Sequence, residues 1–249
     1  MHYISLGYFC SVASDLEKLG LRECSSPFDW LISDFEGVML AIQEHCVDFL
    51  EYRYLSQDQK RHHVYKNTKY NIKFCHDFSK YKSLQEQLPN IRKKYNRRIE
   101  RFFDAITTPT CFIRYISDEK TIDGKSSELV YIENNYDKIL DIIKAFNKEN
   151  EIIFIANEGV TSDKVPLFNV QKDENDVVAR RPIYKSSVLF EKFSNIDMPN
   201  KQANIDRYLE KEKARNSMSS YLKRKCVSAF NRIFLKEYLH ESQYYESSY

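Results

Sequence analysis

Four short runs rich in Ile, Phe and Tyr predict β-strands along the first two thirds of the chain. The last run is continuously apolar over 152–155, which is typical of a strand covered on both faces of a sheet. Polar or reactive residues follow each run at once. The four strands are predicted over 3–7, 70–75, 111–116 and 151–156.

Apolar residues spaced three or four positions apart predict helices between these strands. A helix over 11–19 ends at Gly20, a residue type that suits the end of a helix. The segments 33–36 and 83–86 have the Ser-x-x-Glu spacing of a capping box, so each marks the N-terminus of a helix. The second one opens a long amphipathic helix, and a further helix is predicted over about 134–148.

Strands and helices therefore alternate, which favours an α/β fold. The predicted fold class is a single α/β domain over 1–195, with a mostly parallel central sheet flanked by helices. Within it, 160–182 is expected to be loop and 183–190 an edge strand. Residues 196–249 are predicted to form a basic amphipathic helical extension.

The composition is that of a soluble globular protein, with 42% apolar and 30% charged residues in a chain of 249. The net charge of +2 gives no reason to expect nucleic acid as a partner. The first residues run directly into a strand, and no apolar stretch approaches the roughly 20 residues that cross a bilayer. The six cysteines are scattered, so we expect a cytoplasmic protein with reduced thiols.

Familiar cofactor and catalytic motifs are absent from the sequence. The chain has no G-x-G-x-x-G, no P-loop, no G-x-S-x-G and no H-E-x-x-H. The spacings of Cys and His match no standard zinc site. We therefore expect no cofactor and no metal, while the substrate stays open among small molecules, peptides and glycans.

The predicted strand ends carry the residues best suited to chemistry. Gly7 and Cys10 follow the first strand, and His76 and Asp77 follow the second. Further polar residues follow the third and fourth strands. If the strands are parallel, these groups meet at one edge of the sheet, where α/β folds bind their ligands.

Cys10 is the candidate nucleophile because it stands at the start of the predicted helix over 11–19. The positive end of a helix lowers the pKa of a thiol, and the thiolate is the reactive form. The alternative is a structural cysteine, since free cysteine is among the most buried residue types. Spacing alone leaves both interpretations open.

His76 is the candidate base, because imidazole titrates near neutrality and can accept a proton from a thiol. A structural hydrogen bond is an equally good interpretation. Asp77 is expected to cap the following turn, since successive strand residues point to opposite faces. Asp29 and Trp30 lie in Pro-Phe-Asp-Trp and either line a pocket or begin a helix, with Asp29 as its cap and Trp30 in the core.

Three arginines are candidate ligands for an anion. Arg97 and Arg98 share the long amphipathic helix, and arginine binds carboxylate or phosphate through two parallel hydrogen bonds. A solvated helix face is the common alternative, although Arg98 lies beside the apolar stripe. Arg114 interrupts the third strand, where a charge must be paired or must bind something.

These segments together resemble a bacterial and viral domain family labelled as papain-like cysteine peptidases. The resemblance covers about residues 3–157. Its motifs are Ser-Leu-Gly-x-x-Cys at 5–10, Pro-Phe-Asp-Trp at 27–30, His-Asp-Phe at 76–78 and Arg-Arg-Ile-x-x-Phe at 97–102.

The resemblance implies that Cys10 is the nucleophile and that His76 is its base. It implies Asp77 or Asn71 as the orienting residue, with Asp29 less suited to that role. It also makes Gly7 a site residue. The basic C-terminal helices lie outside the resemblance.

Three functional hypotheses follow. The first is a cysteine-dependent hydrolase or acyl-transfer enzyme, in which Cys10 attacks a carbonyl and His76 moves the proton. The second is a glycosyltransferase-type enzyme of cell-surface polysaccharide synthesis, and the third is a non-catalytic binding module. The basic stretch over 205–240 has two alternative roles. It either contacts the inner face of the membrane peripherally, or forms a helix pair that binds a partner or covers the core.

Overall fold

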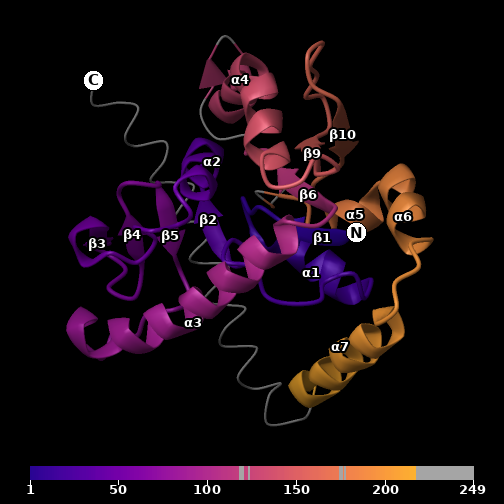
Figure 1. The fold of residues 1–249 in the computed structure, drawn as a ribbon. Helices are drawn as coiled ribbons and strands as arrows, with labels where there is room; N and C mark the ends of the chain where they lie inside the picture. Colours follow the sequence, from indigo (N-terminus) through magenta and orange to yellow (C-terminus); the bar gives the residue numbers. More distant parts are fainter. Residues whose placement is uncertain (118–120, 123, 174–175, 177, 217–249) are drawn as a thin grey trace.

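A four-stranded parallel sheet forms the centre of the protein (Figure 1). The computed structural model describes residues 1–117, 121–122, 124–173, 176 and 178–216. The strands are, in spatial order, β1 (His2–Ser5), β6 (Thr110–Tyr115), β9 (Glu151–Asn157) and β10 (Leu167–Val170). Every neighbouring pair among them is parallel, so their carboxyl ends lie at one edge.

A second, antiparallel sheet is inserted between β1 and β6 and lies to the left in Figure 1. Its spatial order is β2 (Leu31–Ser33), β5 (Ile72–Phe74), β4 (Tyr65–Asn67) and β3 (Leu55–Gln57). The smaller elements are the 3₁₀ turn η1 (Tyr52–Tyr54) and a hairpin of β7 (Thr121–Ile122) and β8 (Lys125–Ser126).

Helices cover both faces of the parallel sheet. They are α1 (Cys10–Lys18), α2 (Phe35–Gln43), α3 (Leu84–Ile106), α4 (Ser127–Lys144), α5 (Pro182–Lys185), α6 (Ser187–Ser194) and α7 (Lys201–Asn216). In Figure 1, α3 runs from beneath the antiparallel sheet to the parallel one. The structure thus confirms the predicted α/β class with a parallel sheet flanked by helices.

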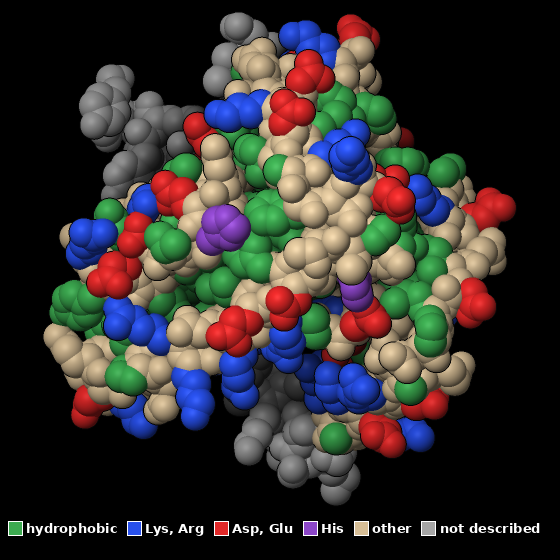
Figure 2. Space-filling model, in the orientation of Figure 1, with side chains coloured by type: hydrophobic (Ala, Val, Ile, Leu, Met, Phe, Trp, Pro, Cys, Tyr) green, Lys and Arg blue, Asp and Glu red, His purple; other side chains and the backbone are tan. Residues whose placement is uncertain are grey.

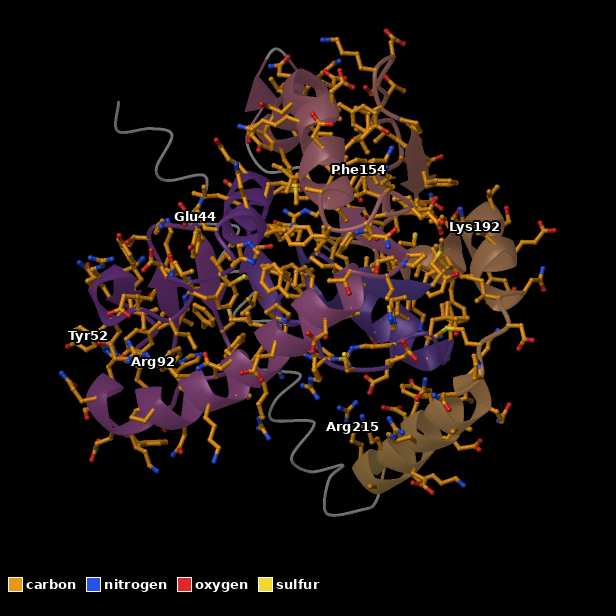
Figure 3. All side chains as sticks on the ribbon, viewed as in Figure 1. Glu44, Tyr52, Arg92, Phe154, Lys192 and Arg215 are labelled. Atoms are coloured by element: carbon orange, nitrogen blue, oxygen red, sulfur yellow. The ribbon has the colours of Figure 1, made fainter. Side chains whose placement is uncertain are left out.

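The alternation of side chains along β6 divides the interior into two cores. Cys111 and Tyr115 pack with α1, α5 and α6 on one face. Phe112 and Ile116 pack with α2, α3 and α4 on the other. Phe154 of β9 lies in this second core, near the centre of the molecule, and its ring meets Phe35 edge-on at 5.6 Å (Figure 3).

The prediction that 70–75 belongs to the parallel sheet is wrong, because β5 pairs antiparallel with β2 and β4. Its three residues alternate buried, half-buried, buried, as in a strand with only one covered face. The turn before it uses Asn71 at a φ of 51°, which joins β4 to β5 as adjacent strands. The four predicted strand ends therefore do not meet at one edge.

The fourth parallel strand, β10, lies inside the segment predicted to be loop, so that prediction is wrong. The edge strand predicted over 183–190 is also wrong, since α5 and α6 occupy it. Local signals explain the helices: Pro182 stands in the first turn of α5, and the Ser186 hydroxyl accepts a hydrogen bond from the Leu189 amide to cap α6.

The two predicted capping boxes differ in outcome. Ser83 and Glu86 exchange both hydrogen bonds of the motif at the start of α3, which confirms that prediction. The box at 33–36 is wrong: Asp34 caps α2 by accepting from the Glu36 amide at 3.1 Å. Ser33 is instead the last residue of β2, and its hydroxyl accepts a hydrogen bond from Arg114.

Helix α7 confirms a helix in the first part of the predicted C-terminal extension and packs on α1. Asn204 donates to the Gly20 carbonyl at 3.0 Å, and Lys211 pairs with Glu17 at 2.7 Å. The rest of the predicted basic stretch lies outside the described residues. Within the described part of the chain, no helix combines the length and apolar character needed to cross a membrane.

Gly37 sets how closely α2 approaches the antiparallel sheet. A Cβ atom there would lie 1.7 Å from the carbonyl oxygen of Tyr70. Alanine favours helix over glycine by about 1 kcal/mol, but overpacking against backbone costs about 1–3 kcal/mol. We expect Gly37→Ala to lower the free energy of unfolding by about 2 kcal/mol in urea denaturation.

Gly159→Ala is the matched control, because its Cβ would meet nothing within 4 Å, although its φ is 88°. Its loss is expected to be about 1 kcal/mol, the cost of the left-handed backbone. A Gly37→Ala protein as stable as the wild type would contradict the close approach of α2 and Tyr70.

Candidate functional site

Cys10 is the first residue of α1, just beyond the carboxyl end of β1. It is half-buried. The N-cap residue, Phe9, offers no side-chain hydrogen bond to the helix, so the first amides of α1 lack a capping side chain. Burial raises the pKa of the Cys10 thiol, and its own backbone amide lowers that pKa by less.

Gly7 brings the chain from β1 to this position through a backbone turn with a φ of 84°. A Cβ atom at Gly7 would stand 2.5 Å from the Ser33 hydroxyl and 3.1 Å from Nη1 of Arg114. The peptide bond between Gly7 and Tyr8 is cis. Only glycine can adopt this positive φ and also fit into the space available. The turn therefore requires glycine at position 7 for structural reasons.

Arg114 is fully buried behind this turn and uses all five of its N–H donors. Nε and Nη2 donate to the two carboxylate oxygens of Glu128 at 2.8 and 2.7 Å. Nη1 donates to the Leu6 carbonyl and the Ser33 hydroxyl, both at 2.9 Å, and Nη2 also donates to the Ser33 carbonyl at 2.7 Å. Its donors are occupied within the protein, so none is left for the substrate-binding role predicted for it.

A second group of candidate residues lies against α3. Asp29 is buried and accepts from Nε of Arg22 at 3.0 Å and from the Ser26 amide at 2.8 Å. Burial raises the pKa of the Asp29 carboxyl, and the Arg22 charge opposes that rise. The Arg22 guanidinium also lies 5.7 Å above the ring of half-buried Trp30.

Asp77 belongs to the same side of the molecule. Its carboxylate accepts from the Tyr95 hydroxyl at 2.9 Å and also bonds Lys94, both on α3. The Arg98 guanidinium, also on α3, lies 5.1 Å from the centre of the Tyr95 ring. Asp77 is therefore tied to α3 and does not cap the turn after β5.

His76 is exposed at the end of β5. The β2–β5 register pairs Leu31 with Phe74, the last residue of β5, so His76 lies two residues beyond the paired strand. No hydrogen bond or ion pair within the described residues joins His76 to Cys10, and no histidine contributes to the pKa of the thiol. The pairing of these two residues therefore stays a prediction.

The two remaining candidates lie on the surface. Asn71 is exposed in the β4–β5 turn, where its side-chain amide donates to Asp34 at 3.0 Å. Arg97 is exposed on α3. The predicted site residues thus fall into two groups, with Gly7, Cys10 and Arg114 at the edge of the parallel sheet and Asp29, Asp77 and Arg98 beside α3.

Sequence reasoning missed several partners in these groups. The strand charge at Arg114 called for a carboxylate, but nothing in the spacing distinguished Glu128 from the other acidic residues. Asp15 was missed because it occupies an ordinary position on α1. It is buried, accepts from the Ile183 amide at 2.9 Å, and its pKa is raised by burial from 3.8 to about 7.

Comparison with known proteins assigns the family. The family model described as "Putative papain-like cysteine peptidase" matches residues 1–156, and the chain belongs to this family. An uncharacterized protein of Acanthamoeba polyphaga mimivirus is 30% identical over 176 residues, which is 62% of this chain and 77% of that protein. No solved structure matches the chain.

Arg114 and Glu128 form a buried ion pair, so removing one partner strands the other charge. We expect Arg114→Met to lower the free energy of unfolding by about 3–5 kcal/mol. The double variant Arg114→Met with Glu128→Met should recover at least half of that loss, measured by urea unfolding. If the double variant is no more stable than the single one, the hydrogen bonds to Leu6 and Ser33 dominate instead.

Asp15 makes stability depend on pH. Its pKa is higher in the folded state, at about 7, than its ordinary value of 3.8. The folded protein therefore holds the proton more tightly, so this stabilisation is complete below about 3.8 and is lost as pH rises through about 7. We expect Asp15→Asn to lose this dependence and to exceed the wild type in thermal stability at pH 8 but not at pH 5. If the difference in melting temperature between Asp15→Asn and the wild type is the same at pH 5 and at pH 8, the pH dependence does not come from Asp15.

Proposed function

We propose that this protein is a cysteine-dependent hydrolase or acyl-transfer enzyme with Cys10 as the nucleophile. The observation that carries the proposal is the position of Cys10 as first residue of α1, beyond the carboxyl end of β1, with no side chain capping the helix. Ligands of parallel α/β sheets bind at this edge. The family description, a papain-like cysteine peptidase, supports the same residue type as nucleophile.

In the proposed reaction, the Cys10 thiolate attacks an acyl carbonyl and forms a tetrahedral oxyanion. The uncapped first amides of α1 point toward the position of that charge, and the helix dipole favours it. Collapse of the intermediate expels the leaving group and leaves a thioester on Cys10. Water then completes hydrolysis, or a second nucleophile completes transfer, and the thiol is restored.

The surroundings of Cys10 favour activated acyl groups over amides. An amine leaving group needs a proton from a nearby acid, a role that histidine fills in most cysteine proteases. No hydrogen bond or ion pair among the described residues joins His76 to Cys10. Thiolates and phenolates leave without such help, so we infer a thioester or an aryl ester substrate.

The transferase hypothesis rested partly on arginines placed to hold an anionic donor. Arg114 no longer serves that argument, because its donors are occupied by Glu128, Ser33 and the Leu6 carbonyl. The family description names a peptidase rather than a transferase or a binding module. No contact within the described residues favours either alternative over the cysteine enzyme.

Hydrolysis of 4-nitrophenyl acetate tests the proposal. We expect Cys10→Ala to abolish turnover beyond one equivalent, while Cys24→Ala, which removes an exposed thiol, keeps it. Because burial raises the pKa of Cys10, the rate should keep rising with pH past about 8.5, the usual value for a thiol. Turnover by the Cys10→Ala variant equal to that of the wild type would sink the proposal.

His76→Ala separates the two mechanisms. Without a role for the imidazole, turnover should change by less than about threefold, since general base catalysis contributes about 100-fold or more. A loss of that larger size, with a rate that levels off near neutral pH, would instead support the histidine as the base.

A further inference from the structure

A small cavity lies beside α3, apart from Cys10. Its polar wall is made by Arg22, Cys24, Ser26 and Asp29, and Phe102 of α3 closes one side. Cys24 is exposed, so the cavity lies at the surface rather than in the core. Arg98 and Arg101 precede Phe102 on α3, by four residues and by one.

The carboxylates around this cavity already have hydrogen-bond partners. Asp29 is bonded by Arg22, and Glu17 pairs with Lys211 at 2.7 Å. Glu23, the neighbour of Cys24 in sequence, is bonded by His2. The carboxylates of this region are therefore already bonded within the protein.

Arg98 and Arg101 lack a carboxylate partner. Neither forms an ion pair with a carboxylate anywhere in the described part of the chain, although Glu100 and Asp104 share their helix. Arg101 donates from Nε to the Arg97 carbonyl at 3.0 Å, and Arg98 stacks on the Tyr95 ring. Among the described residues, the outer nitrogens of both side chains have no hydrogen-bond partner. Figure 2 shows basic side chains gathered in a band along the lower edge, over α3 and toward the end of α7, where Figure 3 labels Arg215.

Both arginines act on the groups of the cavity wall. The Arg101 charge is the largest influence that lowers the pKa of Cys24 against its burial, and Arg22 adds to it. The Arg98 charge lowers the pKa of Asp29 in the same way. Both arginines start from the turn of α3 whose Phe102 lines the cavity, and Arg98, four residues before Phe102, lies on nearly the same helix face.

We propose that Arg98 and Arg101 bind a phosphate monoester at the mouth of this cavity, beside Cys24. Two guanidinium groups without carboxylate partners leave an excess of two positive charges, which matches a phosphate dianion better than a single carboxylate. Each guanidinium can donate two parallel hydrogen bonds to phosphate oxygens. Arg22 holds the floor of the site and stays bonded to Asp29, so it adds positive charge without leaving its partner.

Cys24 is a built-in reporter of occupancy. Iodoacetamide is uncharged, so the rate of its reaction at Cys24, followed by mass spectrometry, reports access to the thiol and its pKa. Phenyl phosphate at constant ionic strength should slow alkylation of Cys24 at least fivefold and saturably, while leaving the rate at Cys10 within twofold. A bound dianion both covers the thiol and disfavours its thiolate.

Arg98→Gln and Arg101→Gln should each remove most of the protection by phenyl phosphate. Lys93→Gln, which removes an exposed charge from the same helix, is the matched control and should keep it. Since these side chains are exposed or half-buried, the variants are expected to fold, which circular dichroism checks. Protection that survives in both arginine variants overturns the proposal.

Two sources of the monoester are distinguished in the same assay. Phenyl phosphate represents a soluble metabolite, and vesicles containing phosphatidic acid represent a lipid headgroup. Protection by the soluble ester supports a small-molecule site, and protection by the vesicles alone supports the lipid headgroup. Protection by neither overturns the proposal, and none of these outcomes depends on the chemistry proposed for Cys10.

Discussion

The buried guanidinium of Arg114 is the interaction on which the arrangement of this fold depends. It joins three parts of the molecule that are distant in sequence: the end of β1 through Leu6, the end of β2 through Ser33, and the start of α4 through Glu128. A charge in that position is tolerated only because every donor has a partner. The same network fills the space beside Gly7, so it also fixes the turn that leads to Cys10.

The two groups of polar residues follow from the insertion of an antiparallel sheet into a parallel α/β frame. Cys10 belongs to the frame, at the edge where ligands usually bind. Asp29 and Asp77 belong to the insertion, which is bonded to α3 through the contacts of Asp77 with Lys94 and Tyr95. One chain thus carries a thiol site and an arginine-rich surface that share no described hydrogen bond or ion pair.

Sequence pattern predicted the α/β class, three of the parallel strands and the capping box of α3, because burial on two faces and helix capping are local signals. It placed β5 in the wrong sheet, since strand direction depends on partners far along the chain. The hydrophobic strand β10 was hidden by polar neighbours. At the sites, Cys10 and Arg114 stood out as residue types, but their neighbours were decided by tertiary contacts, so neither the distance from Cys10 to His76 nor the identity of Glu128 was readable.

The pairing of β1 with β6 has a consequence for synthesis on the ribosome. His2 finds its partner at Thr110, so β1 leaves the ribosome long before the strand that completes its hydrogen bonds exists. At about 5–20 residues per second this interval lasts on the order of 5–20 s. The inserted antiparallel sheet, whose strands all lie between Leu31 and Phe74, is complete well within that time. It is the first sheet of this chain able to form.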